Sequence, residues 1–179
     1  MANSPPITIT RSPEAPGYTP TAISGGFASL LVNLAEHIEA ERDIENASVW
    51  DIAFDNWLRH AEKARTDMSN LLTSILREDI VRLEDKPLKR MAMLINGVVV
   101  SEEPGAYQYL RPFVLQFDNL FRCTGQDPTS LRVDRMLLTA RDRLEAMCSL
   151  DIYAPVRTSD TPQATEDEAE DLLSGHCPG

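Results

Sequence analysis

The sequence has little of what disulfide scaffolds and metal sites require. Its 179 residues include three cysteines and three histidines. The cysteines, Cys123, Cys148 and Cys177, are odd in number and lack the CxxC spacing of zinc knuckles, so neither a disulfide framework nor a zinc finger is expected. A reducing compartment is the simplest interpretation, and we expect the chain to be cytoplasmic.

Aromatic residues and long apolar runs are also scarce. Aromatics make up 6% of the chain, and Leu, Ala, Glu, Asp and Arg dominate, a mixture that suits helices better than strands. No stretch approaches the roughly 20 apolar residues of a membrane span, and the first residues lack the apolar segment of a secretory signal. We therefore expect no membrane partner.

Positive charge is in short supply, since the formal net charge is -11. Proteins that bind nucleic acid do so largely by neutralising phosphates with Lys and Arg, so a general phosphate-binding surface is excluded. A local basic face remains as an alternative. Arg132 and Arg135 would form it, although Asp134 lies between them and a charge-mixed solvated helix explains the same pattern.

Catalytic motifs are missing as well. The chain has no GxSxG, HExxH, P-loop, GxGxxG or kinase signature. His37 and His60 lack a carboxylate three residues before them, so the Glu-x-x-His motif of di-iron bundles is absent, although His37 has Glu41 four residues later. We expect no enzymatic activity, metal or cofactor. A ligand-binding or catalytic site assembled from distant residues remains an alternative, because such a site leaves no local motif.

What the sequence does contain is helical periodicity. The apolar pattern predicts an all-α bundle of about five helices over residues 22–153. The first helix is expected to begin after Ser24 and to end near Glu45, with a break at Asn46 and Ala47. Ser48 and Asp51 then resemble the capping box of a second helix.

The second helix carries the longest pattern in the chain. Its apolar residues alternate at spacings of four and three, as in a heptad repeat: Trp50, Phe54, Trp57, Ala61, Ala64, Met68, Leu71 and Ile75. Leu58, Leu72 and Leu76 widen this stripe, which favours a bundle over a two-stranded coiled coil. Large aromatics are common interface anchors, so Trp50, Phe54 and Trp57 are a candidate partner interface, with burial in the core as the alternative.

Three further helices are expected. One follows Pro87 and ends near Val100, where the run Val98 to Val100 also fits a short strand. The next contains Pro112, which either starts it or kinks it. Its apolar residues are spaced for one face: Tyr107, Leu110, Phe113, Val114, Phe117, Leu120 and Phe121. Asp127 and Pro128 have the form of an N-cap and first-turn pair for the last helix, over residues 128–150.

Both ends of the chain lack apolar periodicity. Residues 1–21 are rich in proline and predict a disordered arm, and residues 154–179 predict a disordered acidic tail. Within the tail, a cluster of acidic residues precedes two leucines and forms a candidate docking segment for a basic groove: Glu166, Asp167, Glu168, Glu170, Asp171, Leu172 and Leu173. A solubilising spacer is the alternative.

These features identify no family. By exclusion, the favoured hypothesis is a non-enzymatic protein-protein interaction, assembly or adaptor module, bound to a protein partner or to further copies of itself. The first alternative is a nucleic-acid-associated regulatory or packaging component that uses the arginines of the last helix. The second is a helical ligand-binding domain or enzyme.

Overall fold

The computed structural model describes residues 18–47, 52–101 and 103–155. Within these ranges all regular structure is helical, so the predicted all-α fold is confirmed. None of the helices in this part of the chain has both the length and the hydropathy to cross a membrane. The elements are α1 (Ala22–Glu45), α2 (Phe54–Arg77), α3 (Asp85–Val99), α4 (Ala106–Gln116), the 3₁₀ helix η1 (Asp118–Phe121) and α5 (Pro128–Cys148).

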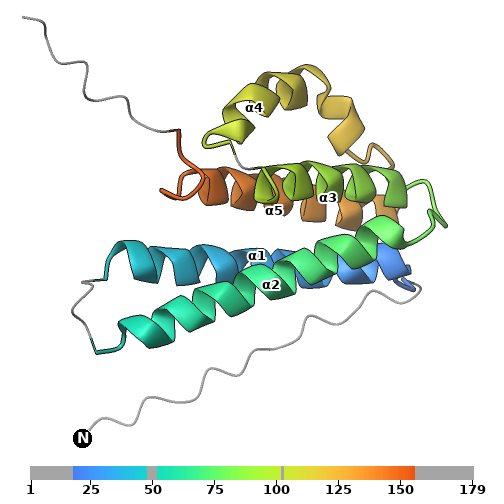
Figure 1. The fold of residues 1–179 in the computed structure, drawn as a ribbon. Coiled ribbons are helices and arrows are strands. Elements are labelled where there is room, and N and C mark those ends of the chain that lie inside the picture. Colours follow the sequence, from blue (N-terminus) through green and yellow to red (C-terminus); the bar gives the residue numbers. More distant parts are fainter. Residues whose placement is uncertain (1–17, 48–51, 102, 156–179) are drawn as a thin grey trace, which may run out of the picture.

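The helices are arranged in layers. Figure 1 shows α1 beside α2 in one layer and α3 beside α5 in the next. The segment α4–η1 lies on the opposite side of α3 and α5 from α1 and α2. The core therefore lies mainly between the α1–α2 layer and the α3–α5 layer, and α4 is an outer element.

The core is formed by one apolar face from each of the four inner helices. The large side chains that are fully buried include Phe27, Leu30 and Leu34 of α1, Met68, Leu72 and Ile75 of α2, Leu88, Met91 and Ile95 of α3, and Leu137 and Leu144 of α5. Burying a side chain of this size contributes about 1.5–3 kcal/mol each before conformational entropy is subtracted. This face-to-face burial, rather than helix propensity alone, holds the bundle together.

Helix α1 begins at Ala22, three residues before the expected start after Ser24. Thr21 is its N-cap and accepts a hydrogen bond from the amide of Ser24, whose hydroxyl accepts one from the amide of Thr21. This reciprocal pair is a capping box with Ser in place of Glu. The Thr21 hydroxyl also donates to the buried carboxylate of Asp85, 2.6 Å away, so the cap is tied to the start of α3.

Helix α2 begins at Phe54, and Trp50 and the predicted Ser48–Asp51 capping box lie outside the described residues. The predicted stripe is buried at Ala61, Ala64, Met68, Leu72 and Ile75, and half-buried at Leu71. Gly26 of α1 allows the close approach of the two helices, since a Cβ there would lie 3.1 Å from Cγ1 of Ile75.

The segments from α3 to α5 settle two points that the sequence left open. Val98 and Val99 are helical and not a strand. Helix α4 starts at Ala106 and contains Pro112, so the helix does not begin at the proline. Gly105 precedes it with a left-handed φ of 77°. As predicted, Asp127 caps α5, because its side chain accepts hydrogen bonds from the amides of Thr129 and Ser130.

Most of the predicted arm and tail lies outside the described residues. Of the arm, Tyr18 to Thr21 are described, and Tyr18 and Thr21 contact the bundle. The Tyr18 hydroxyl donates to Ser24, and the guanidinium of Arg132 lies 4.4 Å from the centre of the Tyr18 ring. Of the tail, only Ala154 and Pro155 are described.

Candidate interaction surfaces

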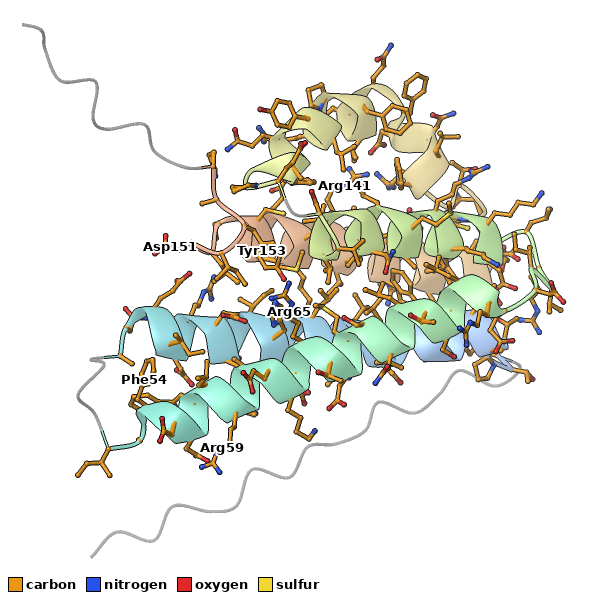
Figure 2. The ribbon with its side chains drawn as sticks, in the orientation of Figure 1. Phe54, Arg59, Arg65, Arg141, Asp151 and Tyr153 are labelled. Atoms are coloured by element: carbon orange, nitrogen blue, oxygen red, sulfur yellow. The ribbon has the colours of Figure 1, made fainter. Side chains whose placement is uncertain are left out.

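The predicted interface on α2 is only partly available for a partner. Phe54 and Trp57 are half-buried, and Trp50 lies outside the described residues. Figure 2 places Phe54 at the N-terminal end of α2. The neighbouring Ile52 and Leu58 are exposed. The aromatic pair is thus half-covered, and one exposed apolar residue lies on each side of it in sequence.

A larger exposed aromatic surface occurs on the outer helix. Tyr109, Phe113 and Phe117 follow one another at intervals of four and define the α4 stripe. They are 78%, 46% and 38% exposed, and the rings of Phe113 and Phe117 lie 4.7 Å apart, centre to centre. The apolar residues predicted to share one face are divided by the structure, since Tyr107, Val114 and Phe121 are buried whereas Phe113 and Phe117 are exposed.

A groove runs along the other side of α4. It lies between α4 and the C-terminal end of α5 and has a volume of about 560 Å³. Leu115 lines it and is exposed, while Arg111 and Glu145 supply charges of both signs. Helix α4 thus presents apolar side chains on two sides. Arg111 is its one charged residue.

A second groove lies where α3 begins. Ile80, Lys86, Lys89, Arg90 and Met93 line it, and its volume is about 370 Å³. Three cations and two apolar side chains therefore face it, without an acidic residue among the lining groups. The ammonium of Lys89 donates to the carbonyl oxygen of Glu78 at 2.6 Å, which fixes its position beside the end of α2. We call this the α3 groove.

The predicted basic face on α5 is less uniform. Arg132 and Arg135 are exposed, but Arg132 stacks on Tyr18. Asp134, between them, forms a two-pronged ion pair with Arg122 at 2.7 and 2.8 Å. The other arginines of the helix also contact neighbouring elements, since Arg141 pairs with Asp118 and Arg143 donates to the carbonyl of Leu31. Arg141 and Arg143 thus join α5 to η1 and to α1.

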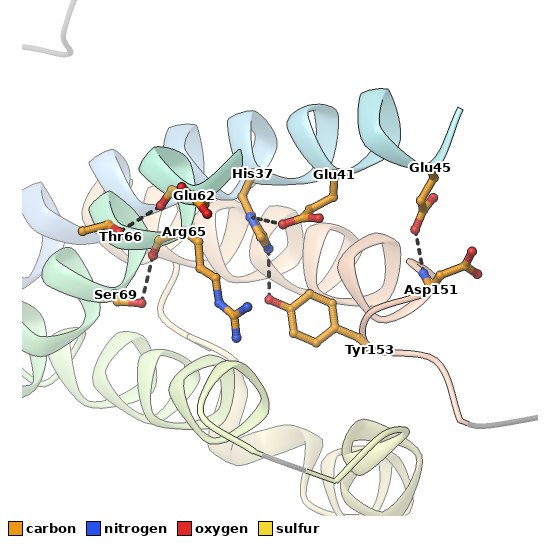
Figure 3. Close-up of polar contacts among 9 residues, drawn as sticks. All are labelled: His37, Glu41, Glu45, Glu62, Arg65, Thr66, Ser69, Asp151 and Tyr153. Atoms are coloured by element: carbon orange, nitrogen blue, oxygen red, sulfur yellow. Dashed lines mark hydrogen bonds and ion pairs between the residues drawn. The ribbon is translucent and has the colours of Figure 1, made fainter. Parts of the chain in front are cut away.

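A polar cluster is buried between α1 and the turn after α5. Nε2 of His37 lies 3.0 Å from the Tyr153 hydroxyl, and Nδ1 lies 3.7 Å from Oε1 of Glu41 (Figure 3). The second distance is too long for a hydrogen bond. Nearby, the amide of Asp151 donates to Glu45 at 2.6 Å.

Burial governs the protonation of this cluster. It lowers the pKa of His37 to about 4, helped by the positive charge of Arg65, so the imidazole is neutral at pH 7. It also raises the pKa of Glu41 and raises that of Tyr153 to about 12. The adjoining cavity of about 80 Å³, lined in part by Arg65 and Tyr153, is far below the volume of ordinary ligand pockets. An imidazole without exposed surface has no access to a substrate, so the cluster has the character of a structural tie.

Metal and thiol chemistry find little support in the same ranges. The described residues hold no group of three or more His, Cys, Asp or Glu side chains placed to bind a metal ion. Cys123 and Cys148 are unbonded thiols, and burial, with a smaller effect from Glu145, raises the pKa of Cys148 to about 12. A thiol with such a pKa is a weak nucleophile at neutral pH.

The candidate docking segment of the tail, Glu166 to Leu173, lies outside the described residues. The α3 groove, which carries the opposite charge to this segment, was missed by the sequence analysis. The cations Lys86, Lys89 and Arg90 are close together in sequence and could have indicated it. Its two apolar residues could not, because Ile80 precedes α3 and Met93 lies within it. No known protein family, curated protein or solved structure matches the chain.

Proposed function

We propose that this chain is a non-enzymatic interaction or assembly module of the cytoplasm, which binds a protein partner through the α4 stripe. The observation that carries the proposal is the exposure of Tyr109, Phe113 and Phe117 together on an outer helix. Aromatic side chains with large exposed areas are the usual anchors of protein interfaces.

The charge of the helix supports the same proposal. Interface cores are depleted of charged residues, and Arg111 is the one charged residue of α4. Leu115 and its groove extend the apolar surface to a second side of the helix. The partner is therefore expected to bring an uncharged segment with apolar side chains, which would cover the stripe and insert beside Leu115.

The test compares three full-length chains as baits in native lysate, with and without nuclease. Phe113→Asp places a charge in the stripe, and Val32→Asp places the same charge on an exposed apolar site of α1 as the matched control. We expect the wild type and Val32→Asp to retain the same protein after nuclease treatment. Phe113→Asp should retain at least about tenfold less of it, since an interface hot spot contributes about 2 kcal/mol or more. Equal retention by both variants would refute the role of the stripe.

Two other outcomes have their own signatures. Sedimentation of the purified chain tests self-association, and a dimer that Phe113→Asp dissociates would identify a second copy as the partner. Retention that nuclease abolishes, and that Arg132→Ala with Arg135→Ala removes, would favour the nucleic-acid alternative. Arg135 matters most in that comparison, because Arg132 is already engaged with Tyr18.

A further inference from the structure

The α3 groove combines positive charge with exposed apolar side chains. Its lining groups are three cations and two exposed apolar side chains, Ile80 and Met93. The chain as a whole has a net charge of -11. Glu78 and Asp79 are close in sequence but do not line the groove. An occupant that suits this surface needs several carboxylates next to apolar side chains.

We propose that the occupant is the chain's own C-terminal segment, Glu166 to Leu173. Only the sequence and length of this segment enter the argument. It contains five acidic residues followed by Leu172 and Leu173. The carboxylates match the cations of the groove, and the two leucines match Ile80 and Met93.

The connecting chain is long enough. Pro155 follows the turn that is bonded to Gly105, where the amide of Gly105 donates to the carbonyl of Tyr153 at 3.0 Å. Gly105 comes shortly after the C-terminal end of α3, whereas the α3 groove lies at the N-terminal end of that helix. Helix α3 has 15 residues and so spans roughly 22 Å. Ten residues, 156–165, separate Pro155 from Glu166. A link of this size reaches about 33 Å when extended.

Tethering favours this occupant over a free one. A segment joined by a short linker reaches an effective concentration in the millimolar range. An acidic segment of another protein would have to exceed that concentration or bind more tightly. The tail therefore covers the α3 groove by default and excludes weaker acidic ligands from it. This inference concerns a surface distinct from the α4 stripe and does not depend on the proposed function.

Zero-length carbodiimide cross-linking of the full chain tests the proposal directly, because it joins an amine to a carboxylate only when the two are in contact. The chain has three lysines, Lys63, Lys86 and Lys89. Lys63 is exposed on α2 and does not line the α3 groove. It serves as an internal control for cross-links to the tail, and its ion pair with Asp67 at 2.6 Å makes the Lys63–Asp67 cross-link a positive control for the reaction. We expect mass spectrometry to find Lys86 and Lys89 joined to Glu166 through Asp171, at least about tenfold more often than Lys63.

Variants test whether apolar contacts in the groove, and not charge attraction alone, hold the tail there. Met93→Ser changes an exposed residue of the groove without adding charge, and Leu172→Ser with Leu173→Ser changes the tail, while Val32→Ser, at an exposed apolar site of α1, is the control. Both test variants should lower the cross-links from Lys86 and Lys89 roughly tenfold, since each removes an apolar contact. The control should leave the cross-links unchanged, and circular dichroism should show all chains folded.

A mixture of chains labelled with ¹⁴N and ¹⁵N identifies the source of the tail. Cross-linked peptides of a single isotope support the proposal. Peptides that mix both isotopes in the statistical proportion would overturn it in favour of the tail of a second copy. Cross-links from Lys86 and Lys89 no more frequent than those from Lys63, or insensitive to Met93→Ser, would also overturn it.

Discussion

Nε2 of His37 and the hydroxyl of Tyr153 lie 3.0 Å apart although 116 positions separate the residues in sequence. The contact fastens the turn after α5 to the middle of α1, and both side chains are buried. Because Nδ1 faces Glu41, we assign the ring proton to Nδ1 and the Tyr153 hydroxyl as the donor to Nε2. This tie leads to the first two predictions.

Tyr153→Phe should destabilise the fold without changing its shape. The substitution removes the hydroxyl and leaves Nε2 of His37 unpaired in the core, at a cost of about 1–3 kcal/mol. Urea unfolding measures the free-energy difference. Tyr109→Phe is the control, since Tyr109 is exposed, and it should stay within about 0.5 kcal/mol of wild type. Equal stability of the two variants would show that the hydroxyl makes no net contribution.

Acid should weaken the fold through the same histidine. His37 has a pKa of about 4 when folded and 6.5 when unfolded, so between these values the unfolded chain binds the proton more strongly. Stability therefore falls as the pH falls through this window, by up to roughly 3 kcal/mol from this group. Glu41 acts in the opposite direction, because its pKa is raised and its contribution is lost as the pH rises.

The variant His37→Gln isolates the effect. Glutamine keeps a polar group near Tyr153 but does not titrate, so the dependence of the unfolding free energy on pH between 6.5 and 4 should become shallower. His60→Gln is the control, because His60 is exposed on α2. An unchanged pH profile in His37→Gln would mean that other groups dominate acid unfolding.

A second long-range tie joins Asp85 to the start of α1. Its carboxylate accepts hydrogen bonds from the Thr21 hydroxyl and from the amides of Val81 and Arg82, at 2.6, 3.1 and 3.0 Å. Asp85→Ala should leave these donors unpaired and lower the unfolding free energy by about 2–4 kcal/mol. Asp79→Ala, on the exposed part of the same turn, should change it by less than about 0.5 kcal/mol.

These ties mark the limit of what the sequence could predict. The core face of α2 and the Asp127 cap were predictable because each rests on residues close in sequence. The role of Asp85 was not, since the pattern around Pro87 indicates a helix boundary but not which distant threonine meets the carboxylate. The pairing of His37 with Tyr153 likewise depends on how α5 ends against α1.

The α4 stripe illustrates a different limit. Spacing showed that Phe113 and Val114 both fit an apolar arc, but adjacent positions on a helix point about 100° apart. Which of them faces the core is decided by the packing of α4 on the layer below it, and the structure buries Val114. The tail segment remains a prediction, because it lies outside the described residues.

Gly105 should be intolerant of any side chain. Its φ of 77° is left-handed, and a Cβ would lie 3.0 Å from Cβ of Pro155. Gly105→Ala should therefore lower the melting temperature, with a cost of about 1–2 kcal/mol for the backbone conformation alone. Gly97→Ala is the matched control, because a Cβ at Gly97 meets nothing within 4 Å and alanine favours helix. Gly97→Ala should be neutral or stabilising, and a similar loss in both variants would contradict this account.

Cys148 should be unreactive in the folded chain. Its pKa of about 12 leaves about one thiol in ten thousand ionised at pH 8, whereas an ordinary cysteine is ionised to roughly a quarter. A chain with Cys123→Ser and Cys177→Ser, which retains Cys148 alone, should react with a thiol-disulfide reagent about a thousandfold more slowly than the same chain in urea. Rapid modification of the folded chain would instead show that Cys148 is accessible as a thiolate, and would contradict its assignment as a buried, unreactive thiol.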